Sequence, residues 1–400
     1  MSNWADLTTG ARIKHLRGTD LTQTQLAEAA DLSLSLIQKA EQDRGELSLS
    51  SLLKIAAALR TDTAVILGQQ APRRGMSHDT RAALRQLSDS VHASALGDWD
   101  GLTDPSDLAV LTEARDAAGE AYWRGDTPKF TALGAKVLLE GRARHESAQG
   151  YERQQIGLVL ATTYQYAASS AVLLGQRDLA LAALTSARNL ANDAGDPYVS
   201  ALVESTLSWI HLRSARAARA TAVAERAAAR IEPSFSRPTT AQLVAYGRLM
   251  ISAAVAASRG GNATMADDYL SQAHASAARL GHDTDLYGTH FGPTFASTEA
   301  VGIAVALGNH GQALRLASRT ELPRTMPKLA RNRYKLDVAL AQVECKLYDA
   351  AADTLVDVGR DAPEWVRHQA LPGVIGKRLA KVSTARVRRV SEAIGMPLFA

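Results

Sequence analysis

The chain has 400 residues, of which 46% are apolar and 22% charged, so it can bury a large core and exceeds the usual length of one domain. Many alanines and leucines with only 5% aromatic residues favour an all-α protein. A single cysteine, Cys345, excludes an internal disulfide. Because we find no signal-peptide core and no unbroken apolar run of transmembrane length, we expect a cytoplasmic protein with no membrane partner.

The excess of basic residues is small and unevenly spread along the chain. The formal net charge is +4, but residues 1–70 contain seven basic and eight acidic side chains. Residues 360–400 contain eight basic and three acidic ones, including Arg386, Arg388 and Arg389. This basic tail is either a solvated last helix or an auxiliary patch for phosphates or a partner.

The N-terminal segment predicts a bundle of five short helices. Thr8 to Arg17 forms the first, and Thr22 with Gln25 has the pattern of a capping box at the start of the second. Asp31 lies where the chain must turn, and Ser33 caps a third helix. Ser48 or Ser50 caps a fourth helix that ends near Leu59, and residues 63–67 close the bundle.

The third helix has two different sides. Ile37 and Ala40 are spaced to point into a core, which leaves Leu34, Ser35, Gln38 and Lys39 on the outward side. Such a helix, fixed on one side with Ser, Gln and Lys on the other, suits docking in the major groove of DNA.

Residues 8–70 resemble a helix-turn-helix domain of the XRE (lambda-repressor-like) type. The resemblance is carried by Leu21-Thr22-Gln23, Leu26-Ala27, Leu32-Ser33, Ile37, Glu41, Leu49, Leu52-Leu53 and Ala56 to Leu59. It implies that Gln23 and Thr24 meet the phosphate backbone, that Arg44 meets another phosphate, and that base edges face Ser33, Leu34, Ser35, Gln38 and Lys39. The sequence departs from the family pattern at Leu34 and Leu36, where polar or basic residues are usual, and at Asp31 and Asp43, where glycines are common.

After a polar linker at residues 69–78, residues 79–400 predict a long series of helix pairs. Turn signals recur near residues 125, 175, 215, 260, 308 and 347, at spacings of 39 to 50 residues. The spacing exceeds the period of about 34 residues of tetratricopeptide repeats, so we expect tetratricopeptide-like pairs with longer helices, stacked as an α-solenoid with an inner groove. The domains are therefore 1–68 for the helix-turn-helix and 79–400 for the repeats.

A helix-turn-helix joined to such repeats resembles the actinobacterial XRE regulators and, more distantly, the peptide-sensing regulators of Gram-positive bacteria. The resemblance implies a small-molecule or peptide effector in the groove. Candidates on the first helix of each pair are Tyr164, Glu204, Trp209, Tyr246, Arg248, Arg331 and Arg333. The stretch from Tyr287 to Thr294 is either a tight turn in which Pro293 starts a helix, or a site that presents His290 and Phe291 to the ligand.

We expect no metal, cofactor or catalytic activity. His282, Asp283, Asp285 and His290 lack the spacing of metal ligands, and no nucleophile elbow or phosphate-binding glycine loop occurs. The sequence thus predicts a DNA-binding regulator that acts as a homodimer on double-stranded DNA. The alternative is a repeat scaffold for a protein partner, with a helix-turn-helix of weak or lost DNA affinity.

Overall fold

The computed structural model describes residues 7–18, 21–44, 47–59, 61, 63–67, 78–99, 102, 104–234 and 236–394. Within these ranges the chain is helical apart from one two-stranded hairpin, which confirms the all-α prediction. The predicted linker, residues 69–78, lies outside the described residues except for His78, at which the next helix begins.

Residues 7–67 form a five-helix bundle, which we call the head. Its helices are α1 (Thr9–Arg17), α2 (Gln23–Ala29), α3 (Leu34–Glu41), α4 (Leu49–Ala58) and α5 (Thr63–Ile66). The predicted capping box is present, since the Gln25 amide donates to Thr22 Oγ1 at 3.1 Å and the Thr22 amide donates to Gln25 Oε1 at 2.8 Å. Ser33 and Ser48 cap α3 and α4. Each cap satisfies an amide that the helix itself leaves unbonded.

The two aspartates that replace family glycines both adopt the left-handed backbone region. Asp31 has φ 50° and Asp43 has φ 54°. Asp43 then accepts a hydrogen bond from the Gly10 amide at 2.8 Å and another from the Thr8 hydroxyl, so its carboxylate ties the end of α3 to the start of α1. Aspartate tolerates this conformation better than most residues, which explains how both turns form without glycine.

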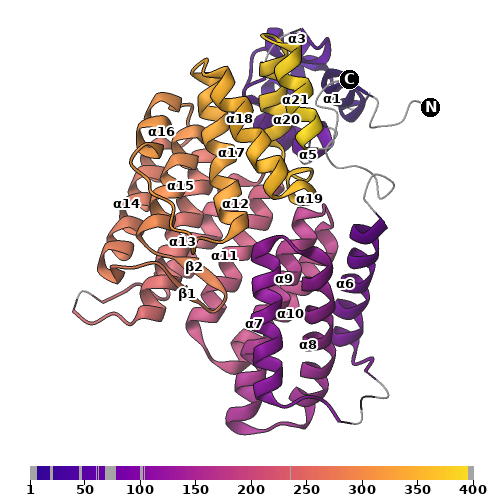
Figure 1. The fold of residues 1–400 in the computed structure, drawn as a ribbon, viewed down its shortest axis with the longest axis vertical. Helices are drawn as coiled ribbons and strands as arrows, with labels where there is room; N and C mark the ends of the chain where they lie inside the picture. Colours follow the sequence, from indigo (N-terminus) through magenta and orange to yellow (C-terminus); the bar gives the residue numbers. More distant parts are fainter. Residues whose placement is uncertain are drawn as a thin grey trace.

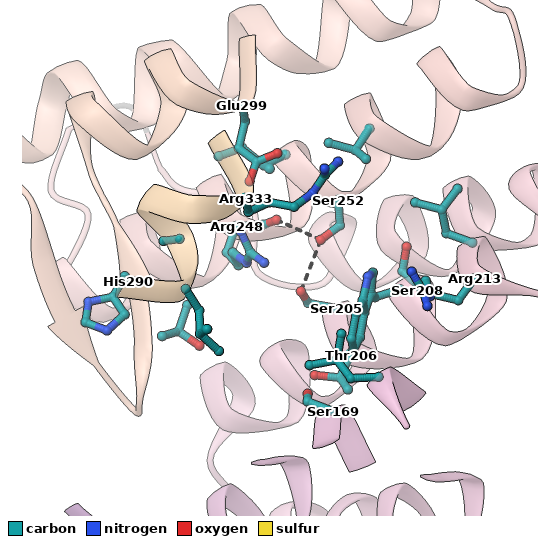
Figure 2. Close-up of a pocket in the computed structure, with 18 of the residues that line it drawn as sticks. Ser169, Ser205, Thr206, Ser208, Arg213, Arg248, Ser252, His290, Glu299 and Arg333 are labelled. Carbon is teal, nitrogen blue, oxygen red and sulfur yellow. Dashed lines mark hydrogen bonds between the residues drawn. The ribbon is translucent and has the colours of Figure 1, made fainter. Parts of the chain in front are cut away.

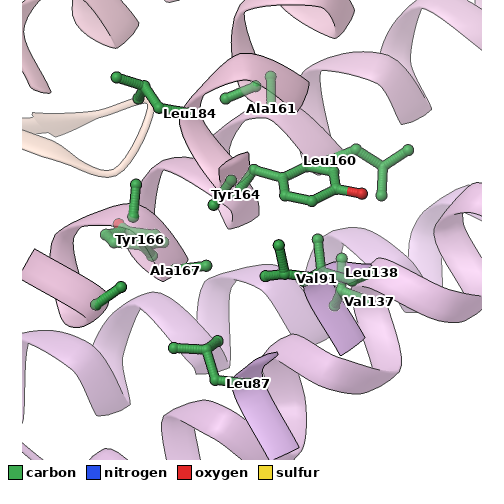
Figure 3. Packing of buried hydrophobic residues seen from close by; sticks show 14 of the residues in the cluster. Leu87, Val91, Val137, Leu138, Leu160, Ala161, Tyr164, Tyr166, Ala167 and Leu184 are labelled. Carbon is green, nitrogen blue, oxygen red and sulfur yellow. The ribbon is translucent and has the colours of Figure 1, made fainter. Parts of the chain in front are cut away.

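Six antiparallel helix pairs follow, and every predicted turn lies between the two helices of one pair. The pairs are α7 (Leu108–Arg124) with α8 (Thr127–Ser147), α9 (Gly150–Leu173) with α10 (Arg177–Ala194), α11 (Pro197–Arg213) with α12 (Ala217–Ala229), α13 (Thr240–Arg259) with α14 (Ala263–Leu280), α15 (Pro293–Ala306) with α16 (His310–Ala317), and α17 (Lys328–Glu344) with α18 (Tyr348–Asp361). Their buried faces form large apolar clusters, one of which surrounds Leu138, Leu160 and Tyr164 (Figure 3).

The array of pairs closes on itself instead of remaining an open, curved stack. The first helices of successive pairs contact one another, and α17 in the last pair also contacts α7 in the first. At this junction Leu329 of α17 lies against Gly125 at the end of α7. We call α7 to α18 the ring. Its inner helices therefore surround a central space.

A β-hairpin between α14 and α15 reaches across the ring. It consists of β1 (Thr284–Leu286) and β2 (Thr289–Phe291), with a turn at Tyr287 and Gly288, whose φ angles are 53° and 68°. The Gly288 carbonyl accepts hydrogen bonds from Tyr166 Oη at 2.9 Å and Trp123 Nε1 at 3.3 Å. Pro293 begins α15, as the tight-turn interpretation predicted.

The remaining helices are α6 (His78–Leu96), which packs on α8, and α19 (Pro363–Val366), α20 (Leu371–Ala380) and α21 (Thr384–Ile394) at the C-terminal end. Figure 1 shows the head beside α20 and α21 at one end of the molecule. Two described helices, α9 and α13, are long and apolar enough to span a membrane by those two criteria alone. Most of each lies inside the protein, with 78% and 67% of the apolar windows buried.

Candidate nucleic-acid interface and central cavity

The side of α3 that was predicted to read DNA is exposed. Ser33, Leu34, Ser35, Gln38 and Lys39 are all exposed, and Leu34 keeps 38% of its surface accessible. The opposite side of α3 is fixed, because Ile37 and Ala40 are buried in the core of the head. In Figure 1, α3 lies at the outer edge of the molecule, away from the ring. The rest of the described chain therefore leaves this side open.

A buried ion pair holds α3 to α1 behind that surface. Arg17 Nε donates to Glu41 Oε1 at 2.5 Å and Arg17 Nη2 donates to Glu41 Oε2 at 3.1 Å. Gln23, at the start of α2, donates from its amide nitrogen to Glu41 Oε2 at 2.8 Å. Burial alone would raise the pKa of Glu41, but these hydrogen bonds and the charge of Arg17 outweigh it and lower that pKa.

The three predicted phosphate contacts have different surroundings. Thr24 and Arg44 are exposed, whereas Gln23 is half-buried and engaged by Glu41. Any contact from Gln23 to DNA would therefore use the part of its amide that Glu41 leaves available. Glu41, the last residue of α3, thus holds α1 and α2 against α3 through Arg17 and Gln23.

The capped α2 and α3, the tight turn at Asp31 and the fixed inner side of α3 give the head the geometry of a helix-turn-helix domain. Residues 14–66 match a family model described as helix-turn-helix. The chain is also similar to the immunity repressor protein of Bacillus phage phi105, with 45% identity over 65 residues. That match spans 16% of this chain and 45% of the phage protein, so the matched region covers less than half the length of that relative.

A central cavity of about 320 Å³ lies inside the ring (Figure 2). Its walls come from the inner helices α7, α9, α11, α13, α15 and α17, from the hairpin, from the segment at α19 and α20, and from the head. The head contributes Leu49 and Leu53 of α4 and Thr63 of α5. Hydroxyl groups line the middle of the cavity, where Ser205 and Ser252 are hydrogen-bonded to each other at 3.1 Å.

Four of the nine predicted groove residues line this cavity, namely Trp209, Arg248, His290 and Arg333. Tyr164 is instead fully buried and hydrogen-bonded to Ser94, at 2.7 Å, and Phe291 is fully buried against Gly247. Both belong to apolar clusters.

The other three predicted groove residues hold neighbouring parts of the fold together. Glu204 pairs with Arg188 at 2.8 Å, and Tyr246 donates to Gln272 at 2.5 Å. Arg331 donates to two backbone carbonyls of the loop before α17. These three side chains, like Tyr164 and Phe291, are therefore not candidates for the cavity.

His290 lies at the hairpin end of the cavity, between aromatic rings. Its ring is stacked on Phe295 with centroids 5.6 Å apart, and Trp123 meets its edge. Burial lowers the pKa of His290 and the charge of Arg248 lowers it further, although Asp285, 3.7 Å away, opposes this. The described residues contain no group of three or more side chains suited to hold a metal ion.

The cavity also contains two arginines that sequence reasoning missed, Arg213 and Arg259. They are the last residues of α11 and α13, which are equivalent positions in neighbouring pairs. Burial lowers the pKa of Arg259 to about 10, and the charges of Arg333 and Arg213 contribute. Their equivalent place at the ends of two first helices was the signal that could have identified them.

The head packs against the ring and the C-terminal helices at the end of the cavity near Arg213. Ala215, in the turn after α11, packs against the core of the head, and Leu49 and Leu67 pack against the C-terminal apolar cluster. Lys377 of α20 donates a hydrogen bond to Thr9 of α1. The tail arginines are engaged within the body, since Arg386 pairs with Asp349 at 2.6 Å and Arg389 with Asp353.

Proposed function

We propose that the protein is a cytoplasmic, DNA-binding transcription regulator whose head reads an operator half-site as part of a homodimer. In this proposal the ring is a tetratricopeptide-like receptor whose central cavity binds an effector. The observation that carries the proposal is the exposed side of α3 on a helix whose other side is fixed in a helix-turn-helix core. The phage immunity repressor supports it, because that relative is named as a repressor.

The residues on this side suit base recognition in the major groove. Gln38 can bond an adenine edge with both ends of its amide, and Lys39 can donate to guanine. Leu34 can contact a thymine methyl group, so an apolar residue at that position is compatible with specific binding. In this proposal Thr24 and Arg44, which are both exposed, meet the flanking phosphates.

The low DNA affinity expected of a single head favours a dimer. A single recognition helix contacts only a few base pairs, and the seven basic and eight acidic residues of segment 1–70 give little electrostatic attraction to DNA. Two heads about 34 Å apart would read two half-sites and combine their affinities.

Effector control follows from the composition of the cavity wall. Leu49, Leu53 and Thr63 belong to the head and line the same cavity as the inner helices of the ring. An effector in the cavity would contact both the head and the ring, and would thereby favour one position of the head over another.

The test is a DNA-binding titration with genomic fragments selected by the purified full-length protein. We expect sequence-dependent, salt-sensitive binding that falls at least about 30-fold in the double variant Gln38→Ala, Lys39→Ala, since each of the two lost base contacts contributes about 1–3 kcal/mol. Lys136→Ala, at an exposed site on α8, is the matched control and should bind like the wild type. Absence of sequence-dependent binding at low salt would favour the scaffold alternative.

A further inference from the structure

The charges inside the central cavity are unbalanced. Among the described residues that line it, four are arginines (Arg213, Arg248, Arg259 and Arg333) and two are carboxylates (Glu299 and Asp337). One carboxylate is already engaged, because Asp337 pairs with Arg333 at 3.2 Å. Within the part of the chain that the structure describes, no carboxylate lies at ion-pair distance from Arg248 or Arg259.

Arg259 has a buried donor atom, Nε, that lacks a hydrogen-bond partner among the described residues. The charges of Arg333 and Arg213 lower its pKa, whereas those of Asp337 and Glu299 raise it, so Arg259 shares this part of the cavity wall with two arginines and both carboxylates. A buried guanidinium group with an unpartnered donor is unfavourable, and a bound anion would accept that hydrogen bond. We call Arg213, Arg259 and Arg333 the arginine cluster.

Two members of the arginine cluster, Arg213 and Arg259, lie toward the end of the cavity that the head covers. Arg213 is two residues before Ala215, which packs against the core of the head, and Arg259 ends the neighbouring inner helix. The rest of the cavity has a different composition, since Trp209, Tyr122, Tyr166 and Phe295 offer aromatic surface beside hydroxyl groups and one further arginine, Arg248. In Figure 2, Arg213 and His290 lie on opposite sides of the cavity, with Arg248 and Arg333 between them.

We infer that the central cavity is the receptor site for a small amphipathic organic anion, whose acidic group binds the arginine cluster and whose apolar body extends toward the hairpin. Guanidinium groups bind oxyanions through paired, charge-assisted hydrogen bonds, and an aromatic-lined cavity of about 320 Å³ suits a small organic molecule. This inference rests on the proposed function in one respect, namely that the cavity is the site at which the regulator binds its effector.

The test uses two fluorescent probes of nearly equal shape, anilinonaphthalene sulfonate and its uncharged analogue phenylnaphthylamine. The full-length protein is titrated with each probe in the absence of DNA. We expect saturable binding of one sulfonate probe per chain, with an affinity at least about tenfold higher than that of the uncharged analogue. Equal affinities, or no saturable binding of the sulfonate, would overturn the inference.

Substitutions in the arginine cluster test where the anionic group of the probe binds. Arg259→Gln should weaken the sulfonate probe about 10- to 100-fold, the range for a lost hydrogen bond to a charged group, and change the uncharged probe less than about twofold. Arg226→Gln, at an exposed site on α12, is the matched control and should leave both probes unchanged. Arg213→Gln tests the same cluster from another helix if the first variant does not fold. Unchanged sulfonate affinity in the folded cluster variants would overturn the inference.

The experiment separates this inference from the proposed function. Probe binding is measured without DNA, so the receptor site can be confirmed even if the head shows no sequence-dependent DNA binding. In the same way, a DNA-binding protein whose cavity ignores the charge of the probe would keep the regulator assignment and lose the anion site.

Discussion

Replacing Glu41 by alanine would remove the acceptor at the centre of the head. The side chain of Glu41 is only 2% exposed and that of Arg17 14%, so the variant leaves a guanidinium group largely buried without its partner. Breaking a buried pair in this way costs about 3–5 kcal/mol. Glu41→Gln keeps the shape and one acceptor oxygen, and should cost less, about 1.5–3 kcal/mol.

Hydrogen exchange of the full-length protein measures this cost locally, because amides of α3 exchange when the head opens. For Glu41→Ala we expect their protection to fall about a hundred- to several-thousand-fold, at 1.4 kcal/mol for each factor of ten. Glu28→Gln, at an exposed site on α2, is the control and should change protection little. A change of less than about threefold in Glu41→Ala would refute the role we assign to the pair.

The pH dependence gives a second measurement of the same interaction. The pKa of Glu41 is lower in the folded head than the ordinary value of 4.5, so the unfolded head takes up the proton more readily. The stabilisation is therefore complete above the unfolded pKa and is lost as the pH falls toward the folded pKa. Protection of α3 should decline below about pH 4.5 in the wild type and more gently in Glu41→Gln.

Two further predictions concern the ring. Gly247→Ala should destabilise the protein by about 1–3 kcal/mol, because the added methyl group would collide with the ring of Phe291. A lower melting temperature in thermal unfolding would show this. Gly157→Ala is the control and should not lower the melting temperature, since the nearest atoms to its added methyl group would be 3.6 Å away. Lys346→Gly should raise the stability by up to about 1 kcal/mol, since Lys346 has φ 63° in the turn before α18, and an unchanged or lower melting temperature would contradict this.

The features that sequence reasoning predicted correctly are local ones. The caps at Thr22, Ser33 and Ser48, the turns between paired helices and the start of α15 at Pro293 each depend on residues within a few positions of one another. The outward side of α3 was predictable for the same reason, because a spacing of three to four residues on one helix decides it.

The cavity was less predictable because the direction of a side chain on an inner helix depends on neighbours far away in the sequence. Tyr164 was selected on the correct helix, yet it is Tyr166, two residues later, that lines the cavity. Arg331 and Arg333 show the same difference, since only Arg333 faces the cavity. Residues two positions apart are separated by about 200° around a helix, so they point to nearly opposite sides. Choosing the correct helix is therefore not enough to choose the residue that faces the cavity.

The closure of the ring was also not predictable, and it changes how an effector could act. A stack of repeats that is free at both ends can change curvature through small rotations that add along it. Here α17 contacts α7, and Gly288 is bonded to Trp123 and Tyr166 across the interior, so such rotations would have to break these contacts. We therefore infer a shorter route for the signal, through Leu49 and Leu53 of the head.

A ligand can shift an equilibrium only by the difference between its affinities for the two states. Apolar contacts supply about 0.8 kcal/mol for each buried methylene group, so contact with these two leucine side chains is enough for the 1–3 kcal/mol that is typical of coupling between sites. An anion on the arginine cluster would lie next to this contact, because Arg213 and Ala215 are two residues apart and Ala215 packs on the head. The position of the recognition helix would then depend on whether the cavity is filled, without any change in the shape of the ring.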